Sequence, residues 1–439
     1  MPADRRFLSI YLFGVFIGAL DTNILGPALP LVAHTFATTL AWTAWTITAY
    51  TAAYIASTVL AGPGGDRIGR RSFFVAGIGL FGAASLLAAL SPNLPLFLVA
   101  RVLQGAGAGL VYPNAQAEGM RSFPEERRGM ALGLFGAVFG LAAIIGPNLG
   151  GLLAQSFGWP SIFLVNVPLA AIVLVLSRRL PKSERHPQGG VPDVWGGVLF
   201  SLTLVCLLLA LSAASLISLI WLAAALLLGA TFALRQRRAS IPFLDTKPLQ
   251  TPAGTFMMAA AAIIGLDLAA AVFVPALAQH QLHFSVLMSG VALMPAAVVG
   301  AVLAGAAGVL VDRLGARLVL QVGLAAAGVG GVLLALPDLG VARFIVAMGF
   351  FGFGTAFTLG APINRLATLL YRKEQLGEAL SLVAVARAVG LMVGPVVFGL
   401  LITGSGFAAP FWLLAAASVV GVGLLVRVPN HRQSGTAGS

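Results

Sequence analysis

Long apolar runs alternate with short polar segments along the whole chain. A helix that crosses a membrane needs about 20 mostly apolar residues. The first run is too long for the core of a signal peptide and has no clear cleavage site, so we interpret it as a retained helix. The pattern predicts an all-α polytopic membrane protein with fourteen spans, at residues 7–29, 42–62, 73–90, 94–117, 129–153, 161–177, 194–212, 216–234, 254–277, 286–310, 318–336, 342–364, 378–402 and 409–426.

The pair of runs at 194–212 and 216–234 leaves two interpretations open. Only a few residues separate them, so they form either a tight hairpin of two spans or one span plus a re-entrant segment. The flanking segments 178–193 and 235–253 are both basic, which places both on the same side of the membrane. An even number of crossings follows, and this favours the hairpin.

Composition and charge support the same class. The chain is 59% hydrophobic and 9% charged, which excludes an ordinary soluble globular protein. With the N-terminus in the cytoplasm, 23 of the 26 Lys and Arg residues fall in predicted cytoplasmic segments. Both termini are therefore predicted to be cytoplasmic. The net charge of +12 reflects this topology, and we expect no binding of nucleic acid.

Two similar charged strings occur in the two halves of the chain. They are GPGGDRIGRR at 62–71 and GVLVDRLGAR at 308–317. Asp66 of the first string is followed 80 residues later by the Gly146-Pro147 pair, and Asp312 of the second is followed 82 residues later by Gly394-Pro395. The same signals in the same order indicate a transporter built by duplication. The predicted organisation is an N-terminal six-helix bundle at 1–178, a two-helix insert with cytoplasmic linkers at 179–252, and a C-terminal six-helix bundle with a short tail at 253–439.

Four strings resemble motifs of the major facilitator superfamily, and more narrowly of its fourteen-helix drug:proton antiporters. GPGGDRIGRR is similar to the signature of the loop between helices 2 and 3, with Gly64 in place of the usual leucine. RVLQGAGAG (101–109), AIIGPNLGG (143–151) and LDTNILGPALP (20–30) are similar to the signatures of the fourth, fifth and first helices. Ala142 stands at the first glycine of the fifth-helix signature. The resemblance covers nearly the whole chain and implies proton-coupled export by alternating access.

The first charged string has two interpretations. We expect Asp66 near the start of the third helix, where the helix dipole favours a carboxylate, and expect the glycines to permit a tight turn. The string is then either a basic loop that fixes topology or, as the resemblance implies, an ion-paired gating latch. Glu118 is a candidate partner, or alternatively a solvated helix end. The latch residues are Gly62, Asp66, Arg67, Gly69, Arg70, Arg71, Glu118, Asp312 and Arg313.

The fifth helix carries the antiporter motif of the resembled family. Pro147 is expected to interrupt and kink this helix, because proline removes a backbone hydrogen bond. The neighbouring glycines allow another helix to approach closely. The motif serves packing alone, or, as the resemblance implies, also seals the cavity against proton leak and sets the direction of exchange. Its residues are Gly146, Pro147, Gly150 and Gly151, with Gly394 and Pro395 in the second half.

Three ionisable residues lie well inside predicted spans: Asp21, Asp267 and Arg387. Arg101 lies shallower, near the outer end of its helix. A charge at mid-bilayer costs about 2.5–3.5 kcal/mol on insertion scales, so such residues usually have a function. The resemblance implies a role in proton transfer for Arg101. Arg387 is interpreted as an anchor to backbone carbonyls inside the bundle.

Asp267 matches no motif and is interpreted from its position alone. It is either a proton carrier or part of a structural ion pair with Arg387 or Arg101. Asp21 and Asp267 lie 14 and 13 residues into the first helices of the two halves, so duplication predicts similar depths on opposite sides of a substrate cavity. A proton and a cationic substrate would compete for such carboxylates, and this competition is antiport.

No hydrolytic constellation, metal-ligand cluster or phosphate-binding loop is evident in the sequence. We therefore expect no enzyme activity, no metal and no cofactor, with a proton gradient as the energy source. The expected protein is a monomer in the lipid bilayer of a bacterial inner membrane that exports small amphipathic, cationic drugs or toxic compounds. The alternatives are metabolite uptake or facilitated diffusion by the same fold, or a membrane sensor that does not transport.

Overall fold

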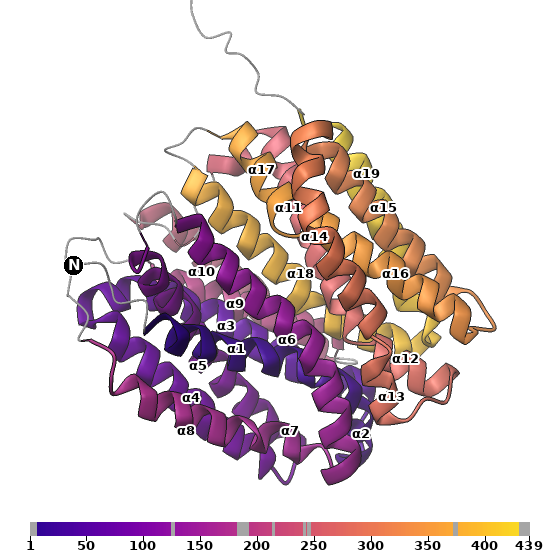
Figure 1. Ribbon diagram of the computed structural model, residues 1–439, viewed down its shortest axis with the longest axis horizontal. Coiled ribbons are helices and arrows are strands. Elements are labelled where there is room, and N and C mark those ends of the chain that lie inside the picture. The colour runs from indigo at the N-terminus through magenta and orange to yellow at the C-terminus, as the bar shows by residue number, and fades with distance from the viewer. Residues whose placement is uncertain are drawn as a thin grey trace, which may run out of the picture. The chain divides into compact units, whose positions relative to one another are not determined.

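A computed structural model describes residues 7–123, 128–181, 193–212, 216–239, 243, 247–371 and 376–429. All regular secondary structure in these ranges is helical (Figure 1). The chain divides into two compact units, Met1–Phe243 and Leu244–Ser439. The predicted all-α class is confirmed.

Unit 1 contains the helices up to α10. Short breaks divide some of the predicted spans, as at η2 between α1 and α2. The helices are α1 (Leu8–Ile24), η2 (Gly26–Ala28), α2 (Leu29–Thr35), α3 (Leu40–Ile68), α4 (Arg70–Ala89), α5 (Leu94–Arg121), α6 (Arg128–Phe157), α7 (Pro160–Leu164), α8 (Asn166–Ser177), α9 (Val194–Ser212) and α10 (Leu216–Arg238).

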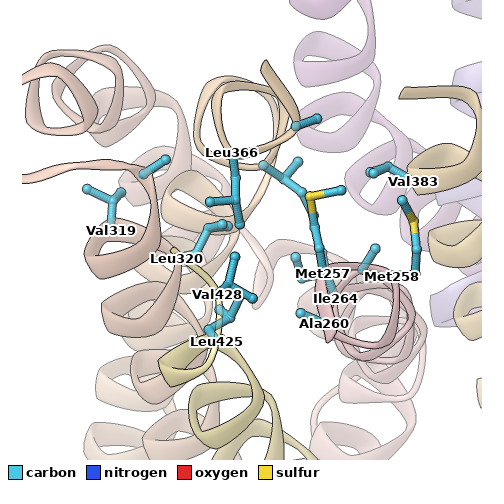
Figure 2. Close-up of a cluster of buried hydrophobic side chains, with 14 of the residues drawn as sticks. Met257, Met258, Ala260, Ile264, Val319, Leu320, Leu366, Val383, Leu425 and Val428 are labelled. Atoms are coloured by element: carbon cyan, nitrogen blue, oxygen red, sulfur yellow. The ribbon is translucent and has the colours of Figure 1, made fainter. Parts of the chain in front are cut away.

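Unit 2 contains the remaining helices. They are η4 (Lys247–Gln250), α11 (Pro252–Ala271), α12 (Val274–Gln281), α13 (Val286–Val291), α14 (Met294–Leu314), α15 (Ala316–Ala335), α16 (Val341–Thr358), α17 (Ala361–Leu370), α18 (Leu376–Ser405) and α19 (Ala408–Val426). The core of this unit joins α11, α15, α17, α18 and α19, as Figure 2 shows for Met257, Leu320, Leu366, Val383 and Leu425.

Thirteen helical segments in the described part of the chain are long and apolar enough to cross a membrane. They correspond to all the predicted spans except the one at 42–62. That run lies in α3, which is 29 residues long but carries several threonine and tyrosine side chains that lower its hydropathy. The polytopic architecture is therefore confirmed, and α3 as the fourteenth span stays a prediction.

Close packing of α5 explains its glycine-rich sequence. A side chain at Gly105 would collide with the backbone of Tyr50, and one at Gly109 with Ser57, so one face of α5 lies directly against α3. A side chain at Gly107 would collide with the backbone of Gly77 in α4. Small residues permit such approaches between helices in lipid.

The Gly-Pro motifs lie inside continuous helices. The expectation that Pro147 interrupts its helix is wrong, because α6 runs unbroken from Arg128 to Phe157, as α18 runs through Pro395. A helix in lipid tolerates proline where neighbouring groups satisfy the freed carbonyl. A side chain at Gly150 would collide with the backbone of Ile24 in α1, and a side chain at Gly394 with Ala269 in α11. The motif glycines therefore permit tight helix contacts.

The two insert helices belong to unit 1. α9 and α10 pack against each other, and α9 also packs on α3. Asp193 caps α9, because its Oδ1 accepts the backbone N–H of Gly196 at 2.9 Å, and it also accepts from Arg235 Nε of α10 at 2.5 Å. Phe243 contacts the rings of Phe200 and Phe232 and so extends this packing to the end of the unit.

Candidate functional site

An ion pair between Asp21 and Arg101 lies in the interior of unit 1. Asp21 comes from α1 and Arg101 from α5, and they are 0% and 1% exposed. The Nη1 atom of Arg101 lies 2.6 Å from Asp21 Oδ2. The two residues that the sequence placed in apolar spans therefore neutralise each other, which is how charges persist in such surroundings.

Polar side chains from three helices surround this pair. Gln104 Nε2 on α5 and Asn166 Nδ2 on α8 donate to Asp21 Oδ1 at 3.2 and 2.8 Å. Gln104 Nε2 also donates to Ser85 Oγ on α4 at 2.7 Å, and its Oε1 accepts from Arg101 Nη1 at 2.8 Å. All three side chains are fully buried. Asp21 thus accepts hydrogen bonds at both oxygens, and the network ties α1 to α4, α5 and α8.

Arg101 is also held by α3 and α7. Its Nε donates to the backbone carbonyl of Thr46 at 3.1 Å. Its guanidinium carbon lies 4.5 Å from the centre of the Tyr50 ring and 5.6 Å from that of Phe163, which are cation–π distances. The guanidinium is therefore fixed by charge, hydrogen bonds and rings together.

Asp267 has a different environment. It lies in α11 and is 3% exposed, and its Oδ1 atom is buried with no hydrogen-bond partner among the described residues. Arg101, one of the two arginines that the sequence left open as a partner, pairs with Asp21 in unit 1. Arg387 lies in α18, where its backbone carbonyl is pressed against Gly265 of α11. A buried carboxyl group with an unsatisfied oxygen is thus the distinctive feature of unit 2.

The charged string of the first half is mostly helical. The expectation that Asp66 lies near the start of the third helix is wrong, because α3 continues to Ile68 and Asp66 lies in its last turn. A carboxylate is unfavourable at this end of a helix dipole, so it needs a cation beside it. Only Gly69 separates α3 from α4, with φ of 115°, a backbone conformation that favours glycine. Gly62 lies within α3.

Arg70 supplies the cation for Asp66. Its Nε and Nη2 atoms lie 2.9 and 2.8 Å from Asp66 Oδ1. Its Nη1 atom lies 4.0 Å from Glu118 Oε1 on α5, and Arg121 Nη1 lies 3.7 Å from the same oxygen. Asp66, Arg70, Glu118 and Arg121 therefore form one cluster of alternating charge that joins the α3–α4 connection to α5. Arg67 is exposed on α3.

Arg71 contacts a different helix. Its Nε and Nη2 atoms donate to the carbonyls of Ser177 and Arg178 at 3.3 and 3.4 Å, where α8 ends. In the second half, Arg317 Nη1 donates to the carbonyls of Val426 and Val428 at 3.3 and 3.1 Å, where α19 ends. Each half therefore uses the last arginine of its charged string to satisfy carbonyls at the end of its final helix.

Asp312 and Arg313 are exposed near the end of α14, and Asp312 forms no ion pair among the described residues. Among the described residues, the second charged string therefore forms no cluster like that of the first.

Sequence reasoning missed Gln104, Asn166 and Ser85. Each is a polar residue in an otherwise apolar run, and Gln104 lies in the motif string RVLQGAGAG. A polar side chain inside a span is the signal that would have found them. Only the folded arrangement shows that all three belong to one network.

Helical units with charges buried inside apolar spans define a polytopic membrane transporter. Residues 11–361 and 255–439 match the Major Facilitator Superfamily, and the chain belongs to this superfamily.

Relatives of this chain include MFS-type transporters and export proteins. An uncharacterized MFS-type transporter of Bacillus subtilis, YfiU, is 30% identical over 92% of this chain and 81% of its own length. The tetracenomycin C resistance and export protein of Streptomyces glaucescens is 32% identical over 88% of this chain and 74% of its own. The riboflavin transporter RibZ of Clostridioides difficile is 28% identical over 89% and 86%.

The fold is also that of solved transporter structures. The crystal structure of the peptide transporter POT in complex with sulfate superposes with a TM-score of 0.74 at 16% identity, and the match covers 96% of this chain and 94% of that one. At this identity the likeness defines the fold alone.

Proposed function

We propose that this transporter is a proton-coupled exporter of small amphipathic, cationic drugs or toxic compounds, of the fourteen-helix drug:proton antiporter group. The observation that carries the proposal is the burial of the Asp267 carboxyl group, whose Oδ1 atom has no hydrogen-bond partner among the described residues. An isolated ionised carboxylate is costly in apolar surroundings, and either a proton or a cation removes that cost. A proton and a cationic substrate that compete for one carboxylate exchange for each other, which is antiport.

Asp21 has a second role in this proposal. Its ion pair with Arg101 at 2.6 Å needs no further cation. A proton that binds Asp21 would remove the attraction that ties α1 to Arg101 on α5, and so couple proton binding to a change in helix packing. The proton and the cationic substrate then compete mainly for Asp267, whereas Asp21 binds the proton alone.

Export is favoured over uptake by the Gly-Pro motif of α6 and by the tetracenomycin C export protein among the relatives. The relative described as a riboflavin transporter favours a second candidate, transport of a metabolite by the same fold. On either function the protein works by alternating access as a monomer, in a bacterial inner membrane with both termini cytoplasmic. It uses a proton gradient and needs no cofactor.

The test is substrate-induced proton release from purified protein, together with pH-driven efflux from proteoliposomes. Asp267→Asn is expected to abolish both for a cationic dye. Asp338→Asn is the matched control, because Asp338 is exposed between α15 and α16 and its φ of 53° suits asparagine. If the Asp267→Asn variant expelled the dye at the rate of the wild-type protein, the proposal would be overturned. Gradient-driven movement of riboflavin without movement of any dye would favour the second candidate.

A further inference from the structure

Every side chain that is hydrogen-bonded to the Asp21 carboxylate in the described part of the chain is a donor. Arg101 donates to Oδ2 at 2.6 Å, while Gln104 and Asn166 donate to Oδ1 at 3.2 and 2.8 Å. This arrangement suits an ionised carboxylate, which only accepts. A protonated carboxyl group carries a hydrogen that must itself find an acceptor. The network therefore has to change when Asp21 takes up a proton.

Gln104 cannot provide that acceptor by turning its amide. Its Oε1 accepts from Arg101 Nη1 at 2.8 Å, and its Nε2 donates to Ser85 Oγ at 2.7 Å. Rotation of the amide would place a donor against Arg101 and an acceptor in place of the bond to Ser85. Both ends of Gln104 are thus fixed by their partners.

Asn166 is different, because only one end of its amide is used. Its Nδ2 donates to Asp21, and its Oδ1 is buried with no hydrogen-bond partner. The last torsion of an asparagine side chain has a broad, roughly two-fold preference, so the amide can turn over without leaving its place. Rotation about this one torsion would therefore bring the unused acceptor of Asn166, its Oδ1 atom, to Asp21.

We propose that Asn166 is a positioning residue that switches its amide with the protonation state of Asp21. This inference rests on the proposed role of Asp21 in proton coupling. With Asp21 ionised, Asn166 Nδ2 donates to Oδ1. When one proton from the medium binds Oδ1, the amide turns and Asn166 Oδ1 accepts the new O–H. Loss of the same proton restores the first arrangement, and Arg101 keeps its charge throughout.

The charged and titratable groups beside Asp21 come from other helices. Arg101 on α5 contacts it directly, and the ring of Tyr50 on α3 lies over Arg101. The Tyr50 hydroxyl lies 3.5 Å from the Gly18 carbonyl of α1. From α8, the neutral amide of Asn166 is the group that bonds Asp21. A switch at Asn166 thus changes the link between α1 and α8 without adding a charge to the site.

Asn166 also lies where α8 begins, directly after the short break at Val165 that separates it from α7. The ring of Phe163 on α7 packs over Arg101. A change in the hydrogen bond between Asn166 and Asp21 therefore acts where α7 meets α8. Binding of a proton to Asp21 on α1 would in this way affect the position of α8, which belongs to the last span of the first six-helix half.

The test is infrared difference spectroscopy of the full chain in lipid nanodiscs, titrated with pH. Wild-type protein is expected to show a carboxyl band from Asp21 and an asparagine amide band that change together, and Asp21→Asn should abolish both. Asn166→Leu should remove the amide band and shift the frequency of the carboxyl band. Asn148→Leu is the matched control for the spectrum, because Asn148 donates to the Ile144 carbonyl of its own helix at 2.6 Å.

Efflux gives a second measurement. Asn166→Leu is expected to slow gradient-driven efflux about tenfold, the scale of one hydrogen bond to a charged group. Asn166→Ser should recover part of the rate, because a serine hydroxyl both donates and accepts. This variant replaces Asn166→Leu in the assay if the leucine variant does not accumulate.

Two outcomes separate this inference from the proposed function. If the Asp21 carboxyl band titrates but the amide region is the same in wild type and Asn166→Leu, the switch is wrong and the proton role of Asp21 stands. If no carboxyl band depends on Asp21, its proton role is wrong, and the switch falls with it.

Discussion

Arg70 reaches back across the Gly69 break to Asp66, and its Nη2 atom lies 2.8 Å from the carboxylate. Without this contact, the carboxylate would face the negative end of the α3 dipole. In the second copy of the charged string, the residue four positions after Asp312 is Ala316, and Asp312 is exposed. The sequence repeat is therefore close, but within the described part of the chain the charged cluster, which includes Glu118, forms at the first copy alone.

The Asp66 cluster leads to the first prediction. Asp66→Asn should cripple transport while the protein inserts and accumulates normally, because the substitution removes an ion pair at the surface of unit 1 and leaves the core unchanged. Asp312→Asn is the matched control and should have a milder effect. Dye efflux normalised to the amount of membrane protein is the measurement. Full activity in Asp66→Asn would leave the string with a topology role alone.

The second prediction concerns the stability of unit 1. Asp21→Asn leaves the buried Arg101 guanidinium without its counter-charge, which should cost about 3–5 kcal/mol. Removing both charges in Asp21→Asn/Arg101→Leu should recover part of this loss, because no buried charge remains. Thermal unfolding in detergent measures the change in Tm. A double variant that is as unstable as the sum of the two single variants would show that the pair is not coupled.

The third prediction compares two glycines of α6. A side chain at Gly150 would collide with the backbone of Ile24 in α1, whereas one at Gly140 meets nothing within 4 Å. Gly150→Ala should therefore lower stability by about 1–3 kcal/mol through overpacking. Gly140→Ala should be neutral or stabilise by up to about 1 kcal/mol, since alanine favours helix. Equal Tm values for the two variants would mean that α6 does not pack tightly on α1.

The fourth prediction concerns topology. A cysteine at Ala214 should react with a membrane-impermeant thiol reagent added outside the cell, and a cysteine at Gln188 should not. Both positions lie outside the residues that the structure describes. The native Cys206 is buried and is replaced in the background for this assay. The reverse labelling pattern would exclude the predicted orientation and the hairpin of α9 and α10 within it.

The sequence by itself predicts the class of the protein and most of its helices. Apolar runs of span length and the distribution of Arg and Lys are properties of the linear chain, and they remain informative whatever packs against them. The motif strings also indicate the superfamily, which the match over residues 11–361 and 255–439 shows. The same linear pattern misplaces Asp66, because a charged, glycine-rich string looks like a loop. At 29 residues, α3 is about 43 Å long, longer than the apolar core of a bilayer at about 30 Å. Its last charged turns can therefore remain helical beyond the apolar core.

Only the tertiary structure decides which polar residues meet. Asp21 and Arg101 are 80 residues apart in sequence, and Asp21 and Asn166 are 145 apart, so no local pattern links them. Packing of α1 against α5 and α8 brings the three together. The same holds for Asp267: the sequence left an ion pair with an arginine open, and the packing of α11 leaves its buried Oδ1 atom without a hydrogen-bond donor among the described residues. Whether a charge in an apolar interior is paired depends on the side chains that neighbouring helices place beside it. The packing of the helices decides which side chains these are.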